Sequence, residues 1–366
     1  MKLTRIAQVA AIGAIAALAL AGCASNESGG GSTPSQSAGP ALSGTLDGSG
    51  ATSQQVAIQA WTAEFQTANP DVTVNYDPQG SGTGRQSFQS GAVSFAGSDR
   101  AFKVDEIAAG PFDACASGSD LVEIPAYVSP IAIAFNLKGV DKLQLDAATI
   151  AGIFAGTITN WNNPAIAATN SGVTLPDLAI TPVHRSDKSG TTANFTDYLS
   201  QAAPSVWTYG SVEEWPLKSG EAAQGTSGVV NAIKGGNGTI GYADHSQTAD
   251  LSAVTVQVGT QWVDPSADGA SIALDASSVE TGRAPTDLAF AINRTTEQSG
   301  AYPVMLVSYL IGCVEYKDAA AAALVKGFFT TAVSEAGQKA AATAAGSAPI
   351  SSDLASKSQA AIDQIK

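Results

Sequence analysis

The chain has 366 residues, which is enough for about two domains. Its formal net charge is −14, and this acidic balance argues against nucleic acid as a partner, because phosphate backbones are bound by basic surfaces. A small anion remains compatible with this charge, since local dipoles govern a buried site.

The N-terminus has the pattern of an export signal. Lys2 and Arg5 are basic, residues 6–20 are apolar, and Leu-Ala-Gly precedes Cys23. This pattern resembles the lipobox of bacterial lipoproteins, in which the signal is cut before a cysteine that is then lipidated. The apolar run is short for a membrane span, and the small residues suit a cleavage site. We therefore expect residues 1–22 to be a lipoprotein signal peptide, with an ordinary transmembrane anchor as the alternative.

The next residues form no core. Residues 23–41 are mostly Gly, Ser, Pro and other small polar residues, and they predict a flexible tether. A lipid on Cys23 would then hold an exported chain on the outer face of the cell membrane.

The first part of the fold alternates strands and helices. We expect strands over 42–47, 72–76 and 94–97, turns over 48–53 and 80–84, a helix over 56–68 capped by Thr52 and Ser53, and a helix containing Phe88. This alternation predicts an α/β domain with a largely parallel sheet. Ligands of such sheets bind beyond the carboxyl ends of the strands, where Thr52, Ser81 and Asp99 lie. Turn chemistry explains each residue singly, but three at one edge favour a site.

Two long apolar runs connect this part with a second domain. We interpret 122–136 as a strand that crosses into the second domain, since one strand of that length would be unusual, and 302–311 as the return crossing. Between them we expect helices over 145–154, with Asp146 as N-cap, after 161–164, over 192–199 and over 225–234, and strands over 178–183 and 239–242. Residues 248–285 carry no clear pattern. The Ala-rich tail from Asp318 predicts helices with Leu324, Val325, Phe328 and Phe329 on one buried face.

The stretch 184–191 lies where a predicted strand leads into a predicted helix. It contains Arg185 and the turn Ser189-Gly190-Thr191. The first amides of a helix have no intrahelical partner and carry partial positive charge, so this place suits an anion. By itself the signal is weak, because Ser and Thr cap many helices.

Cysteines and histidines are few. Cys115 and Cys313 remain after the lipobox, and two cysteines of an exported chain pair more often than they stay free. Their separation in sequence neither supports nor excludes a disulfide. His184 and His245 form no cluster with metal-ligand spacing, so we expect no metal site and no cofactor.

Several motifs in order carry a family resemblance. They are Gly48-Ser49-Gly50-Ala51-Thr52, Gly80-Ser81-Gly82-Thr83-Gly84, Gly97-Ser98-Asp99 and Arg185-Ser186-Asp187-Lys188-Ser189-Gly190-Thr191, supported by 153–161 and 238–242. Over most of residues 44–366 the chain resembles the phosphate-binding lipoproteins of bacterial phosphate ABC importers. The resemblance implies an α/β, two-lobed periplasmic-binding-protein fold of type II, in which each lobe is a mixed, mostly parallel sheet flanked by helices. Lobe I would comprise 42–128 and 303–366, lobe II would comprise 129–302, and the two hinge crossings would lie near 127–131 and 300–304.

The resemblance also implies a ligand set. From the first lobe it implies the hydroxyls and amides of Thr52 and Ser81, the Ser53 amide and the Asp99 carboxylate. From the second lobe it implies the Arg185 guanidinium, the Ser189 hydroxyl and amide, and the amides of Gly190 and Thr191, with Asp187 orienting Arg185. His184 and Lys188 are not matched and are interpreted as flanking residues. Ser53 departs from the family pattern, since some members carry a bulky aromatic there, but the family contact is through the amide.

Asp99 is the predicted selectivity element. A carboxylate only accepts hydrogen bonds, so it suits phosphate, which brings a proton at neutral pH, whereas fully ionised sulfate brings none. An unpaired buried polar group costs on the order of 1–3 kcal/mol, and more when it is charged. The alternative for Asp99 is a strand-end carboxylate that is exposed or paired with Arg100 or Lys103.

The expected function is therefore capture of inorganic phosphate and its delivery to an ABC permease and its ATPase, without catalysis, by a monomer. The alternatives are a binding protein for sulfate or molybdate, a phosphate-ester hydrolase, and an adhesin or scaffold that binds no ligand. A hydrolase would need a metal cluster or an activated nucleophile, and Ser189 has no matching His-Asp partner.

Overall fold

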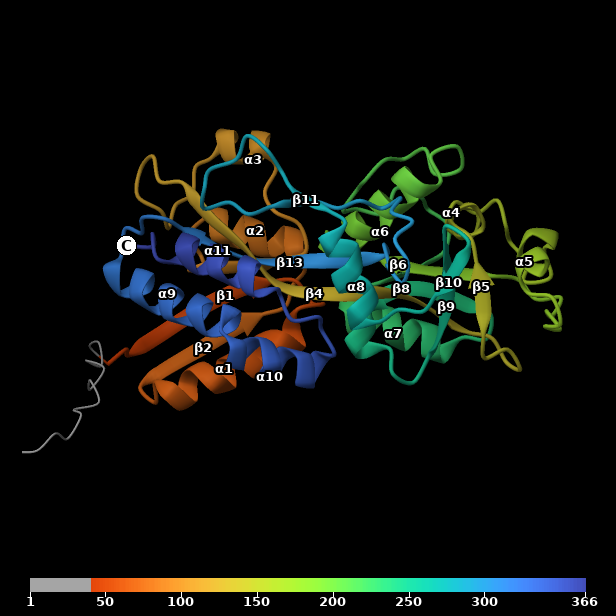
Figure 1. Ribbon diagram of the computed structural model, residues 1–366, viewed down its shortest axis with the longest axis horizontal. Coiled ribbons are helices and arrows are strands. Elements are labelled where there is room, and N and C mark those ends of the chain that lie inside the picture. Colours follow the sequence, from red (N-terminus) through yellow and green to blue (C-terminus); the bar gives the residue numbers. More distant parts are fainter. Residues whose placement is uncertain (1–40) are drawn as a thin grey trace, which may run out of the picture. The chain divides into compact units, whose positions relative to one another are not determined.

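A computed structural model describes residues 41–366 of the protein. The predicted signal peptide, the lipidation at Cys23 and the tether up to residue 40 lie outside the described residues. The described part consists of two α/β lobes (Figure 1). None of its helices combines the length and the apolar character that a membrane crossing needs.

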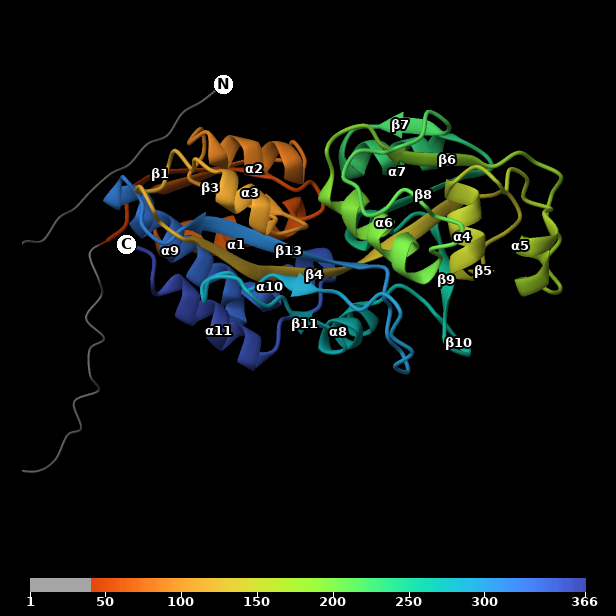
Figure 2. The same ribbon diagram turned by 90° about the horizontal axis from the view of Figure 1, so that it is seen from above.

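Lobe I is built on the strand order β2-β1-β3-β13-β4. The strands β2, β1 and β3 pair in parallel, whereas β13 is antiparallel to both of its neighbours. Its elements are β1 (Gly44–Gly50), α1 (Gln55–Ala68), β2 (Val72–Asp77), α2 (Ser81–Gln89), β3 (Phe95–Ser98), α3 (Val104–Ala109), β13 (Met305–Cys313), α9 (Ala319–Val333), α10 (Glu335–Ala345) and α11 (Ser352–Ile362). The helices cover both faces of this sheet, with α2 and α3 on one side and α9 to α11 on the other (Figure 2).

Lobe II continues the same sheet in the order β4-β8-β6-β7, and β9 joins β5 and β10 beside it. The pairs β8–β6, β6–β7 and β5–β9 are parallel. The elements between β4 and β13 are β5 (Leu143–Leu145), α4 (Ala147–Phe154), α5 (Pro164–Thr169), β6 (Thr181–Arg185), α6 (Gly190–Ala202), β7 (Glu221–Ala223), α7 (Gly225–Gly235), β8 (Thr239–Asp244), the 3-10 turn η1 (His245–Gln247), β9 (Ser252–Val258), β10 (Gln261–Val263) and α8 (Ala267–Asp275), followed by the small pair β11 (Ser278–Val279) and β12 (Phe290–Ala291).

The first long apolar run is one strand. β4 (Leu121–Asn136) has 16 residues; its first half pairs with β13, and its second half pairs with β8 and β9. The crossing between the domains is therefore a continuous strand (Figure 1), although strands of this length are unusual. All but its last residue are buried, which explains the unbroken apolar pattern.

The segment before β13 contacts lobe I before the chain makes its second crossing. The Leu288 amide donates to the Glu123 carbonyl at 2.9 Å, and the Thr286 hydroxyl donates to the Leu121 carbonyl at 2.7 Å. The contacts of residues 286–288 with β4 thus precede the second crossing.

The glycine-rich stretch after the first strand differs from its prediction as a turn. β1 extends to Gly50, because Gly48 to Gly50 pair in parallel with β3. A Cβ at Gly50 would lie 1.9 Å from the Gly97 carbonyl oxygen, so the glycine allows a close approach of two strands.

The N-cap residues of the helices agree only in part with those predicted from the sequence. The prediction of Asp146 as N-cap is confirmed, since its side chain accepts from the Thr149 amide at 2.7 Å. The prediction of Thr52 and Ser53 as caps is wrong, because the N-cap of α1 is Gln54, which makes no side-chain cap. The hydroxyls of Thr52 and Ser53 instead form contacts described below.

The C-terminal helices pack on lobe I as the Ala-rich tail predicts. Leu324, Val325, Phe328 and Phe329 of α9 are buried. The indole of Trp61 on α1 donates to the Gly337 carbonyl on α10 at 2.9 Å, which ties the first helix of the lobe to its last section.

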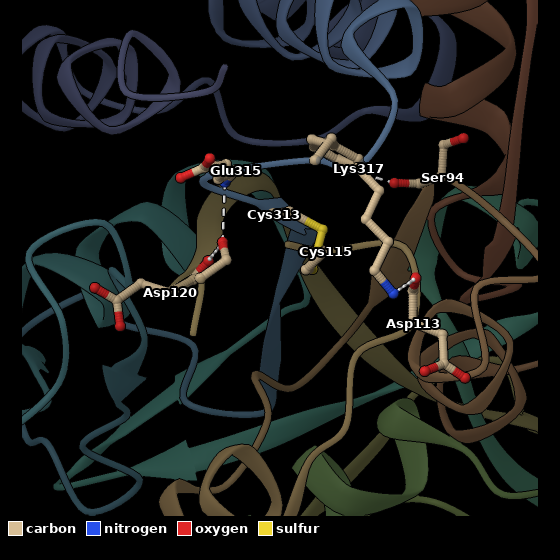
Figure 3. Close-up of a disulfide and its surroundings, with 9 residues drawn as sticks. Ser94, Asp113, Cys115, Asp120, Cys313, Glu315 and Lys317 are labelled. Atoms are coloured by element: carbon tan, nitrogen blue, oxygen red, sulfur yellow. Dashed lines mark hydrogen bonds between the residues drawn. A yellow bond between two sulfur atoms is a disulfide. The ribbon is translucent and has the colours of Figure 1, made fainter. Parts of the chain in front are cut away.

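Cys115 and Cys313 form a disulfide that joins the segment before β4 to the end of β13 (Figure 3). Among the hydrogen bonds near it, Lys317 Nζ donates to the Asp113 carbonyl at 2.7 Å, and the Glu315 amide donates to Ser119 Oγ at 2.9 Å (Figure 3).

Candidate anion-binding site

The candidate ligands come from three helix starts. Thr52 and Ser53 lie between β1 and α1, Ser81 opens α2, and Gly190 and Thr191 open α6. All of them are buried. Each start follows a strand of a parallel pair, so the topology brings their N-termini to the carboxyl ends of β1, β2 and β6.

Asp99 lies at the centre of this arrangement. Its Oδ1 accepts from Ser53 and Ser308, at 2.7 and 2.8 Å, and its Oδ2 accepts from Ser53 and Thr191, at 2.7 and 2.8 Å. Its own amide donates to Ser81 Oγ at 3.1 Å. Neither Arg100 nor Lys103 pairs with it, so the alternative of a local salt bridge is not the arrangement found.

Burial raises the pKa of Asp99 above its ordinary value, and the hydroxyls of Ser53, Thr191 and Ser308 and the charge of Arg185 oppose this shift. The carboxyl is 2% exposed. The protein therefore surrounds a costly buried acid with donors that favour its ionised form.

Five backbone amides of the candidate ligands have no hydrogen-bond partner within the described residues. They belong to Thr52, Ser53, Ser81, Gly190 and Thr191. Unpaired amides in buried positions are rare, and at helix starts they also carry partial positive charge. Amides of this kind are suited to bind an anion.

Arg185 ends β6 and is 2% exposed. Its Nε donates to Asp187 Oδ1 at 2.7 Å, and its Nη2 forms an ion pair with Asp187 Oδ2. No hydrogen bond within residues 41–366 engages Nη1, so this nitrogen remains for a ligand. Burial raises the pKa of Asp187, but the hydrogen bonds and charge of Arg185 offset it and leave the pKa lowered.

Ser189 is engaged differently from the expectation. Its hydroxyl caps α6 by accepting from the Thr192 amide at 3.2 Å, and its amide donates to the Glu213 carbonyl at 3.1 Å. Its hydroxyl proton is therefore still available to a ligand, whereas its amide is not.

The two lobes are hydrogen-bonded to each other at the site. Thr52 Oγ1 lies 2.9 Å from Thr226 Oγ1 and accepts from the Thr226 amide at 3.1 Å. Glu213 of lobe II binds Arg85 and Arg100 of lobe I, each at 2.7 Å. A Cβ at Gly190 would lie 2.5 Å from Ser81 Oγ, so the close approach of the lobes requires glycine there.

Sequence reasoning missed Ser308, Thr226 and Glu213. Ser308 lies within the apolar run of β13, and a hydroxyl in a fully buried strand is the signal that could have indicated it. The other two carry no local signal, because only the folding of lobe II brings them to lobe I. His184, predicted as flanking, stacks on Trp215 with ring centroids 5.0 Å apart.

A cavity of about 440 Å³ borders the site. Asp99 is the only candidate ligand among the residues that line it. Arg100, Asn194 and Arg294 also line it. Among residues 41–366, no group of three or more His, Cys, Asp or Glu side chains could hold a metal ion.

Comparisons with known proteins show the family to which the chain belongs. A family model described as a PBP superfamily domain matches residues 35–336. Phosphate-binding protein PstS 3 of Mycobacterium tuberculosis is 34% identical over 347 residues, covering 91% of this chain and 92% of the relative. Phosphate-binding protein PstS of Xylella fastidiosa is 31% identical over 307 residues, covering 81% and 80%.

Solved structures share the fold. The high-affinity periplasmic phosphate-binding protein PfluDING, bound with phosphate, has a TM-score of 0.70 at 23% identity and covers 87% of this chain and 93% of its own. A phosphate-binding protein from Stenotrophomonas maltophilia has a TM-score of 0.66 at 22% identity, with the same coverage. This chain therefore belongs to the PBP superfamily and, within it, to the PstS family of periplasmic phosphate-binding proteins, whose two-lobed type II fold it has.

Proposed function

We propose that this chain binds inorganic phosphate between its lobes outside the cytoplasm and delivers it to an ABC permease and its ATPase. The observation that carries the proposal is the buried carboxylate of Asp99 in lobe I, which accepts from Thr191 of lobe II, together with unpaired amides at helix starts of both lobes and the buried Arg185. The names of the relatives, which are phosphate-binding proteins, support the same ligand.

We propose as ligands Thr52, Ser53, Ser81, Asp99, Arg185, Ser189, Gly190 and Thr191. The amides of Thr52, Ser53, Ser81, Gly190 and Thr191 and the hydroxyls of Thr52, Ser81 and Ser189 would donate to phosphate oxygens. Arg185 would supply a charged donor through Nη1. Asp187 would hold the guanidinium in place, as its ion pair with Arg185 suggests.

Asp99 would accept a hydrogen bond from the protonated oxygen of phosphate and reject sulfate, which has no proton to donate. Calorimetric titration is expected to show phosphate binding at least about 100-fold tighter than sulfate at neutral pH. Sulfate binding as tight as phosphate binding would contradict the proposal.

Asp99→Asn tests the selectivity element. The amide can donate to an anion oxygen, so the difference between phosphate and sulfate is expected to narrow by at least about tenfold. Asp71→Asn, at an exposed position of the same lobe, is the matched control. A variant that rejects sulfate as firmly as the parent would show that Asp99 is not the filter.

The remaining parts of the proposal concern the whole chain. Lobe I would comprise 42–128 and 303–366, and lobe II would comprise 129–302. Residues 286–288 belong to the lobe II range but contact lobe I.

The chain would act as a monomer without catalysis, and incubation with a generic phosphomonoester should release no phosphate. Cys23 would carry the membrane anchor, so Cys23→Ser should move the exported protein from the membrane to the soluble fraction.

A further inference from the structure

Two serines of lobe I hold the Asp99 carboxylate. Ser53 Oγ lies 2.7 Å from both carboxylate oxygens, and Ser308 Oγ lies 2.8 Å from Oδ1. Both serines are 0% exposed. Ser53 precedes α1 and Ser308 lies on β13, so the carboxylate is held from two elements that are distant in sequence.

Neither hydroxyl has an evident structural duty. The N-cap of α1 is Gln54, so Ser53 does not cap that helix. Ser308 is a polar residue in an otherwise largely apolar, fully buried strand, and the pairing of β13 with β4 shifts register between Ser308 and Tyr309. A register shift of this kind changes the direction of a side chain, and here the hydroxyl at the shift contacts Asp99.

The two serines differ from the third hydroxyl, that of Thr191. Thr191 belongs to lobe II, so it contacts Asp99 only while the lobes are together. Ser53 and Ser308 belong to the same lobe as Asp99 and accompany it whether or not the lobes are in contact.

We propose that the hydroxyls of Ser53 and Ser308 keep Asp99 deprotonated, and that these two serines thereby determine the pH range over which the site selects phosphate over sulfate. This inference rests on the proposed function. It gives the Ser53 side chain a role beyond that of its amide, and it assigns a specificity role to Ser308, which lies outside the proposed ligand set.

The ionisable groups around Asp99 are consistent with this role. Arg185 of β6 favours the ionised carboxyl, and Tyr76 of β2, whose pKa is raised by burial and by Asp99, stays neutral. The charged groups that line the adjoining cavity with Asp99 are Arg100, Lys103, Asp197, Glu280, Arg283 and Arg294. Because burial is the largest influence on Asp99 and acts toward protonation, the loss of either hydroxyl leaves that influence less opposed.

The consequence is a change in specificity with pH. A protonated Asp99 can donate a hydrogen bond to an oxygen of sulfate. Sulfate can therefore bind although it carries no proton. Sulfate binding by the parent should thus strengthen as pH falls through the pKa of Asp99. A variant that lacks one hydroxyl should show the same transition at higher pH.

The experiment measures sulfate affinity by calorimetry from about pH 4.5 to about pH 8.5, a range chosen to span a raised carboxyl pKa. Ser53→Ala and Ser308→Ala are each expected to move the transition upward by about one to two pH units, since a hydrogen bond to a charged group is worth that much. Ser90→Ala, at an exposed position of the same lobe, should stay near the parent. Asp99→Asn should show no transition.

The outcomes separate the two proposals. A parent that fails to bind phosphate overturns the proposed function. A parent that binds phosphate, with alanine variants whose transitions coincide with its own, overturns the inference alone. Carbon-13 NMR of the aspartate carboxyls measures the Asp99 titration without any anion. Because the two serines lie on different elements, either alanine variant can test the inference if the other fails to fold.

Discussion

At the scale of single residues, glycine determines how closely the lobes approach. The Cβ that a substitution would add to Gly190 lies 2.5 Å from Ser81 Oγ and 2.7 Å from Asp99 Cβ. These atoms belong to the opposite lobe, so the collision can be relieved by opening the cleft without unfolding either lobe. A residue at this place therefore influences binding separately from stability.

Gly190→Ala is expected to weaken phosphate binding at least about tenfold while leaving the unfolding temperature within a few degrees of the parent, because Ala favours a helix start no less than Gly. Calorimetry and thermal unfolding measure the two effects. Gly235→Ala is the control, since a Cβ there meets nothing within 4 Å. Unchanged affinity in Gly190→Ala would show that the lobes need not come this close.

Asp244 is a buried acid near the crossing between the lobes. Burial raises its pKa to about 7, although Ser246 and Tyr127 donate to its Oδ1. Its Oδ2 has no partner within the described residues. The folded protein thus holds a proton on Asp244 at pH values where the unfolded chain has lost it.

Because the pKa of Asp244 is raised in the folded state, its bound proton stabilises the fold. This stabilisation is complete below the ordinary pKa of an aspartate and is lost as pH rises to about 7. Asp244→Asn has no proton to lose, so the free energy of unfolding of the parent should fall relative to this variant between about pH 4 and pH 7, by a few kcal/mol. Urea unfolding at several pH values measures the difference. Asp353→Asn, exposed on α11, should run parallel to the parent, and parallel curves for Asp244→Asn would contradict the assignment.

At the scale of elements, the segment between α6 and β7 connects the lobes through one acid. The Glu213 carboxylate accepts from Arg85 of α2 and from Arg100 after β3, and its side chain is 9% exposed. The Glu213 carbonyl also accepts from the Ser189 amide. Burial raises the pKa of Glu213, but the two arginines offset this and leave the pKa lowered. The acid is therefore ionised where it holds two cations of the other lobe.

Glu213→Gln removes the charge that separates the two arginines and should disfavour the state in which the lobes touch. Breaking a buried ion pair costs a few kcal/mol, so the phosphate Kd is expected to rise at least about tenfold. Glu214→Gln, the exposed neighbour, is the matched control. Small-angle X-ray scattering with and without phosphate reports closure of the lobes. Equal phosphate affinities for both glutamine variants would show that the Glu213 contact does not hold the lobes together.

At the scale of the whole molecule, one disulfide encloses the entire second lobe. Cys115 and Cys313 are separated by 198 residues, and lobe II lies within that loop. A cross-link over a long loop mainly restricts the unfolded chain. It should therefore act on stability and leave the anion site unchanged.

The double variant Cys115→Ala, Cys313→Ala is expected to lower the free energy of unfolding by about 2–4 kcal/mol while the phosphate Kd stays within a factor of about two. Urea denaturation and calorimetry test the two parts. Reduction of the parent should reproduce the loss of stability. An unchanged denaturation midpoint would indicate that the bond does not constrain the chain.

The sequence by itself determined the local structure. Alternating apolar runs and helix starts predicted most strands and helices, because these patterns depend on neighbours a few residues apart. It also placed Thr52, Ser81, Asp99 and Arg185 at helix starts and strand ends, where parallel topology collects ligands. The Asp146 cap was predictable for the same reason.

Only the tertiary structure decided which groups meet across long separations. Ser308 reaches Asp99 over 209 residues, and Thr226 reaches Thr52 over 174. No local pattern encodes such contacts, since they depend on how β13 and the helices of lobe II pack. In the same packing, the Ser189 amide donates to the Glu213 carbonyl and the Ser53 hydroxyl donates to Asp99. The sequence thus indicated that an anion site exists, and the fold decided which hydroxyls hold its acid.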